Sequence, residues 1–181
     1  MSVVATYTSI LVFFSALPPY LRKVLGVSEE MLFLLSVANS STSTTIYAIV
    51  RRLGLGYQTL WRIHIAALTA RVVLFLLPIP LKSLPTNNVV PLLVGLYIGI
   101  GATWAFIGSV QQVIMVSISE PERRDERLGQ LNAAMSIGSI FGCSIASVLG
   151  YLGYETLFVT ASVLMVGAVA LNIAAYRSVA R

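Results

Sequence analysis

The chain has 181 residues, of which 57% are hydrophobic and only 10% are charged, and its formal net charge is +5. Soluble domains carry roughly 25% charged residues, so this composition excludes an ordinary soluble globule, a disordered chain and a nucleic-acid-binding domain. The Lys and Arg residues lie almost entirely between or at the ends of apolar runs, which is typical of loops that face a membrane surface.

Six apolar segments follow one another along the chain, and each is long enough to form a transmembrane helix of about 20 residues. The predicted spans are residues 3–21, 30–50, 60–79, 89–118, 128–152 and 156–176. A tight basic loop, Arg51-Arg52-Leu53-Gly54, follows the second span, and the most charged stretch of the chain precedes the fifth. We therefore expect an all-α membrane protein that forms a single six-helix bundle over residues 1–181.

The distribution of basic residues predicts the orientation of these helices. With a cytoplasmic N-terminus, eight Lys or Arg residues fall on the cytoplasmic side and three on the opposite side. The eight are Arg51, Arg52, Arg62, Arg123, Arg124, Arg127, Arg177 and Arg181, and the three are Arg22, Lys23 and Lys82. We expect a multi-pass protein of the cell membrane with both termini in the cytoplasm.

A weak internal repeat divides the six spans into two groups of three. The turn between the second and third span of each group is rich in glycine, at residues 53–57 and 149–154. Because each group has an odd number of spans, the two groups have opposite orientations, as in an inverted repeat. The alternative is that membrane turns simply favour glycine.

Small residues predict where helices pack closely, since lipid already surrounds apolar side chains and close backbone approach drives association. In the fifth span Gly138, Gly142, Ala146 and Gly150 recur every four residues, and Gly95 and Gly99 do so in the fourth. This spacing indicates tight helix contacts and specifies no function.

Polar residues form stripes on four of the six spans, and a polar group in hydrocarbon costs free energy unless protein or water satisfies it. Two interpretations are open: a shared aqueous cavity, or hydroxyls that bond to their own helix and amides that join two helices. The candidate cavity residues are Tyr7, Asn39, Ser43, Trp104, Gln111, Gln112, Asn132 and Ser136.

Arg71 lies near the middle of the third span, and none of the Asp and Glu residues lies deep in any span. An intramembrane arginine is costly unless it is paired or reaches water. Our first expectation is that Arg71 extends outward to water; the alternatives are carbonyls and hydroxyls of neighbouring helices, or a carboxylate of another polypeptide. His64 is expected at the membrane interface.

No catalytic pattern is present. The sequence has one histidine, one cysteine and no phosphate-binding loop, so it predicts neither an enzyme nor a cofactor or metal site.

The segment from Arg127 to the end carries a resemblance to a known family. Its features are Leu128-Gly129-Gln130-Leu131-Asn132, Gly138, Gly142, the turn over residues 150–154 and an apolar last span from Phe158. With these features the chain resembles the C-terminal six-helix half of a major facilitator superfamily transporter. Arg51, Arg52 and Gly54 are similar to the cytoplasmic loop motif of that family, although Val50 stands where the motif has an acidic residue.

The resemblance implies that the first, second, fourth and fifth helices line a central cavity and that the third and sixth are peripheral. It also implies half of a secondary transporter that moves a small solute by alternating access, in a lipid bilayer, together with a second six-helix half or a second copy of itself. The alternatives are a membrane-embedded interaction or assembly protein and an inactive truncated remnant.

Overall fold

The computed structural model describes residues 1–179, and the side chains of all of these except residues 51, 86, 178 and 179. Arg181, which contributed to the predicted orientation, lies outside the described residues. The elements in chain order are α1 (Ser2–Lys23), α2 (Glu29–Arg52), α3 (Tyr57–Leu76), α4 (Pro78–Leu81), α5 (Thr86–Ser117), the 3₁₀ turn η1 (Pro121–Arg123), α6 (Arg124–Leu149), the 3₁₀ turn η2 (Gly150–Leu152) and α7 (Tyr154–Val179).

The described part of the chain contains six long helices and no strand, which confirms the predicted all-α fold and its helix count. Helices form because an apolar chain in lipid satisfies its backbone polar groups within one segment. Turns separate the helices at residues that cap a helix or that adopt a positive φ. The Ser28 hydroxyl accepts a hydrogen bond from the Met31 N–H at the start of α2, and Gly54 takes a positive φ of 53° just after the end of this helix.

Among residues 1–179, five segments are long and apolar enough to cross a membrane, and they contain α1, α3 with α4, α5, α6 and α7. The exception is α2, a helix of 24 residues that is rich in Ser and Thr and contains Asn39. The structure thus separates one polar helix from five apolar ones.

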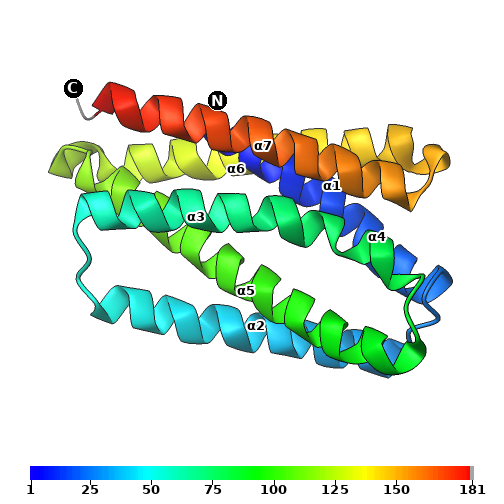
Figure 1. The fold of residues 1–181 in the computed structure, drawn as a ribbon. Helices are drawn as coiled ribbons and strands as arrows, with labels where there is room; N and C mark the ends of the chain where they lie inside the picture. Colours follow the sequence, from blue (N-terminus) through cyan, green and yellow to red (C-terminus); the bar gives the residue numbers. More distant parts are fainter. Residues whose placement is uncertain (180–181) are drawn as a thin grey trace.

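The helices pair as a three-plus-three repeat requires. α1 packs along α6 and α7, α5 packs along α2 and α3, and α3 packs along α7. When the first three long helices are exchanged with the last three, the α1–α6 pairing becomes α5–α2, α1–α7 becomes α5–α3, and α3–α7 becomes itself. The pattern of contacts therefore agrees with the inverted repeat. Figure 1 shows α2 on one side, α6 and α7 on the other and α3 between them, while α5 runs obliquely from α2 to the start of α6.

The main core lies around α1. Phe13 is fully buried, stacks on Phe75 of α3 with ring centres 4.2 Å apart, and contacts Phe158 of α7. Close contact between α6 and α1 extends this core, because Gly138 and Gly142 allow the α6 backbone to approach Val4 and Thr8. These two glycines pack as predicted, whereas Gly95 and Gly150 have no neighbour within 4 Å of an added Cβ.

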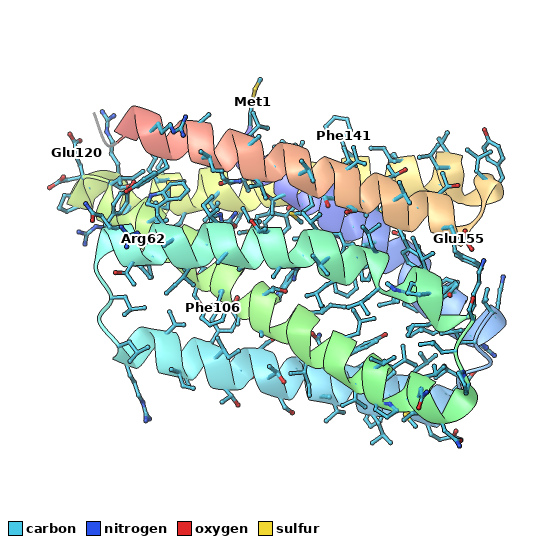
Figure 2. All side chains as sticks on the ribbon, viewed as in Figure 1. Met1, Arg62, Phe106, Glu120, Phe141 and Glu155 are labelled. Atoms are coloured by element: carbon cyan, nitrogen blue, oxygen red, sulfur yellow. The ribbon has the colours of Figure 1, made fainter. Side chains whose placement is uncertain are left out.

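The two ends of the bundle differ in charge. The turns between α2 and α3 and between α5 and α6 lie at one end, which we call the basic end because Arg52, Arg123, Arg124 and Arg127 are there. Figure 2 shows Arg62 and Glu120 at this end and Glu155 at the opposite one. At the opposite end Arg22 pairs with Glu29 at 2.8 Å, and Lys82 pairs with Glu155.

Candidate solute cavity

A cavity of about 490 Å³ lies between α1, α2 and α5. It is lined by Ile10, Leu11 and Phe14 of α1, by Asn39, Ser40, Ser43, Thr44 and Tyr47 of α2, and by Trp104 of α5. One wall is therefore apolar and the other carries hydroxyl and amide groups. Such a lining, with a few polar groups in an apolar concavity, is typical of sites that bind small molecules.

The polar wall is held in place by close contact between α2 and α5. Gly101 of α5 lies directly against the backbone carbonyl of Asn39, where a Cβ would clash. The Ser43 hydroxyl lies 2.9 Å from the Gly101 carbonyl oxygen and 3.0 Å from that of Asn39. The Asn39 side-chain oxygen is buried and has no hydrogen-bond partner among the described residues. This oxygen lies against Gly101 of α5 and is not accessible from the cavity.

Trp104 separates the cavity from the interior of the bundle. Its ring contacts Phe14 and Tyr7 edge to face, with ring centres 6.4 and 5.9 Å away. Tyr7 is buried and does not line the cavity. Of the eight predicted cavity residues, Asn39, Ser43 and Trp104 come together here, and Tyr7 supports Trp104.

Arg71 is fully buried between α3 and α5, so the expectation that it extends to water is wrong. Its Nε donates to the Thr103 hydroxyl at 3.1 Å, and a terminal nitrogen donates to the Ile100 carbonyl at 3.4 Å. The guanidinium carbon lies 5.4 Å from the centre of the Trp104 ring and 5.8 Å from that of Phe75, within the range of cation–π attraction. One neighbouring hydroxyl and one carbonyl thus bind Arg71, which was one of the predicted alternatives, while its other terminal nitrogen is buried without a hydrogen-bond partner among the described residues.

The remaining predicted residues lie elsewhere. Gln111 is buried nearer the basic end and lines a different cavity. Gln112 of α5 and both Asn132 and Ser136 of α6 are exposed on the surface of the chain. The four polar stripes therefore do not converge on one cavity within this chain.

Two polar residues of α1 form hydrogen bonds that stabilise the helix packing or the helix itself. The Ser9 hydroxyl donates to the Ala161 carbonyl of α7 at 2.6 Å, and the Thr6 hydroxyl bonds to the Ser2 carbonyl of its own helix. For this helix the interpretation as structural hydrogen bonds is correct.

In the basic loop, Arg52 is exposed and Gly54 takes a left-handed conformation that favours glycine. The side chain of Arg51, the first residue of the predicted loop motif, lies outside the described part of the structure.

Sequence reasoning missed the apolar wall. Ile10, Leu11 and Phe14 are apolar residues in an apolar helix, so nothing in their pattern distinguishes a cavity wall from a packed core. Only the place of α1 beside α2 and α5 reveals their role.

In a comparison with family models, residues 1–180 match the model described as Major Facilitator Superfamily. The chain belongs to the major facilitator superfamily. This family consists of transporters and not of enzymes, and together with the apolar helices it identifies a multi-pass membrane protein. No curated protein and no solved structure matches the chain.

Proposed function

We propose that this chain is one six-helix half of a secondary transporter, in which it moves a small solute by alternating access. The observation that carries the proposal is the cavity of about 490 Å³ between α1, α2 and α5, with Asn39, Ser43 and Trp104 in its wall. In transporters built from inverted repeats, substrate sites lie near the middle of the membrane and one bundle rocks against another around them.

A second bundle is required because this chain leaves polar groups uncovered. Ser36 and Ser40 of α2 and Asn132 and Ser136 of α6 are exposed, and exposed polar groups are costly in hydrocarbon. Both helices belong to the set that borders the central cavity in this family. The partner we propose is a second six-helix half or a second copy of this chain, which covers this face and closes the cavity.

The orientation that we propose places the basic end in the cytoplasm, with the protein in the cell membrane. The positive-inside rule counts Lys and Arg close to the ends of the spans. Arg52, Arg123, Arg124 and Arg127 lie at the basic end, against Arg22, Lys23 and Lys82 at the other.

Thiol accessibility tests the cavity. In a Cys143→Ser background, which removes the only cysteine, Asn39→Cys and Ser40→Cys should react rapidly with a small, charged, membrane-impermeant thiol reagent. Val166→Cys on α7 is the matched control, because Val166 is exposed but points away from the cavity. Equally slow reaction at all three positions would contradict a water-filled cavity.

Crosslinking tests the partner. Ser136→Cys in the same background should form a disulfide-linked complex with a second copy or capture a second membrane protein, whereas Val166→Cys should not. A chain that stays monomeric in the membrane and moves solute unaided would contradict the proposal.

A further inference from the structure

A full positive charge lies behind one wall of the candidate solute cavity. Among the described residues no charged side chain lines this cavity, and Arg71 is fully buried outside it. The guanidinium carbon of Arg71 nevertheless lies only 5.4 Å from the centre of the Trp104 ring, and Trp104 does line the cavity. The Trp104 ring is therefore the layer that separates the Arg71 charge from the cavity.

This charge is not neutralised within the chain. Arginine stays protonated in proteins, and the two groups that accept its hydrogen bonds, the Thr103 hydroxyl and the Ile100 carbonyl, are uncharged. All seven Asp and Glu residues lie in connections between helices or in the first turn of a helix. On α2 the last of them, Glu30, comes ten residues before Ser40 of the cavity wall, which is about 15 Å along the helix axis.

A partner protein cannot neutralise the charge by contact, because Arg71 has no exposed surface. The cavity beyond Trp104 is a space that a negative charge can enter. The one histidine, His64, does not contribute to this cavity. It is buried beside the smaller cavity near the basic end and is not at the membrane interface, as the sequence suggested.

The cavity wall also carries hydrogen-bond donors that are free to meet a ligand. Ser40, Thr44, Tyr47 and Trp104 line the cavity, and their hydroxyl and indole groups form no hydrogen bond with the described residues. Ser40 and Thr44 are exposed, and neither the Tyr47 hydroxyl nor Trp104 Nε1 is sealed from water. Hydroxyl and indole groups donate hydrogen bonds, and anions accept the strongest ones.

We propose that the solute of this cavity is a small organic anion. Its charged group lies among the four donors, where the Arg71 charge attracts it across the Trp104 ring, and its apolar body lies against Ile10, Leu11 and Phe14. Contact with Arg71 is not needed, since the attraction between charges extends far in apolar surroundings. This inference rests on the proposed transport function, because it names the class of solute for the same cavity.

Charged thiol reagents of similar size measure the potential in the cavity. We compare anionic sulfonatoethyl methanethiosulfonate with cationic trimethylammonioethyl methanethiosulfonate on the full chain in a non-ionic detergent, in the Cys143→Ser background. Each rate is divided by the rate of the same reagent with mercaptoethanol. At about 10 Å and an effective dielectric constant of about 20, one charge changes the local concentration of another about tenfold. The ratio of anionic to cationic rates at Ser40→Cys and Thr44→Cys should thus be at least about tenfold higher than at Ser136→Cys, which is exposed outside the cavity.

Variants of Arg71 test the origin of this preference. Arg71→Gln should lower the ratio at Ser40→Cys to that of Ser136→Cys, and Arg71→Lys, which keeps the charge, should preserve most of it. Arg62→Gln is the matched control, because Arg62 is an exposed arginine of the same helix that does not line the cavity. Helix content and elution volume check that each variant folds. If Arg71→Gln does not fold, the ratio measured with Arg71 in place still tests the proposal.

The possible failures are distinguishable. Slow reaction of both reagents at Ser40→Cys and Thr44→Cys would contradict a water-filled cavity and so the proposed function itself. Rapid reaction of both, with the same ratio as at Ser136→Cys, would leave the cavity in place and overturn the anionic solute. An anion preference that persists in folded Arg71→Gln would also overturn the inference, since the charge would then come from elsewhere.

Discussion

The internal repeat relates two helix pairs, α1 with α6 and α5 with α2. Both pairs pack closely through glycine, but α1 is also held by other helices, whereas α2 is not. In both pairs glycine lets one backbone approach a carbonyl of the other helix, at Gly138 and Gly142 in the first pair and at Gly101 in the second. However, α1 also packs along α7 and carries the fully buried Phe13 of the main core, whereas α2, within the described part of the chain, has extensive contacts with α5 alone.

Close packing at glycine therefore does not by itself fix the position of a helix. A helix fixed on several sides cannot move away from a clash, but a helix held along one seam can. The α1–α6 pair therefore acts as the fixed part of the bundle, and α2 is the helix whose position depends on a single interface.

The largest effect is expected for Gly142→Ala. The added Cβ would lie 2.5 Å from the Thr8 carbonyl oxygen and 2.7 Å from the Leu11 Cβ, and α1 is fixed by its other contacts. We expect a loss of about 2–3 kcal/mol of stability, in the range of overpacking, measured by thermal or denaturant unfolding in detergent. Gly167→Ala is the control, since nothing lies within 4 Å of its added Cβ, and equal losses in both would contradict the packing argument.

A smaller effect is expected for Gly101→Ala, in the other pair. Its Cβ would clash with the Asn39 carbonyl, but α2 can shift outward, so we expect a loss of about 1–2 kcal/mol. Gly108→Ala should cost less still, because its Cβ meets only the hydroxyl end of the Tyr47 side chain. If Gly101→Ala destabilises the protein more than Gly142→Ala, α2 is not the less restrained helix.

A still smaller effect is expected from loss of the hydrogen bond between α2 and α5. Ser43→Ala removes the bond to the Gly101 carbonyl and should cost about 0.5–1 kcal/mol, as is typical of such bonds in membranes. Ser36→Ala is the matched control, since the Ser36 hydroxyl bonds only to Leu32 of its own helix and is exposed. The difference in unfolding temperature between the two variants isolates the bond between helices.

The smallest effect is expected at the surface. Glu29→Gln breaks the pair with Arg22 that joins the end of α1 to the start of α2, and both side chains are more than half exposed. Exposed pairs contribute little, so the unfolding temperature should not change measurably. A clear drop would show that α2 has a second anchor besides its seam with α5.

The course of the helices could be predicted from the sequence, whereas the rotation and depth of single side chains could not. Apolar runs and glycine turns place the six helices, and Gly138 and Gly142 pack as their spacing indicates. Trp104 and Gln111 lie seven residues apart and so on one face of α5. They are nevertheless about 10 Å apart along the axis, and the structure assigns them to different cavities.

Arg71 illustrates the same limit. Its position in the third span shows that it is at membrane depth, but the choice between an outward and an inward side chain depends on Thr103 and Ile100, which come about 30 residues later. Likewise, the Ser9 hydroxyl reaches Ala161 at the far end of the chain. Such contacts depend on how helices distant in sequence meet, and no local pattern encodes them.

The polarity of α2 has a consequence for biosynthesis. Ser43 and its acceptor Gly101 are 58 residues apart, so α2 leaves the ribosome well before the helix that covers its polar seam. Until then its hydroxyls must be satisfied within the helix, and Ser36, Ser43 and Thr45 indeed each reach the carbonyl four residues earlier. The hydrogen bond between α2 and α5 can therefore form only after the chain has been extended by these 58 residues.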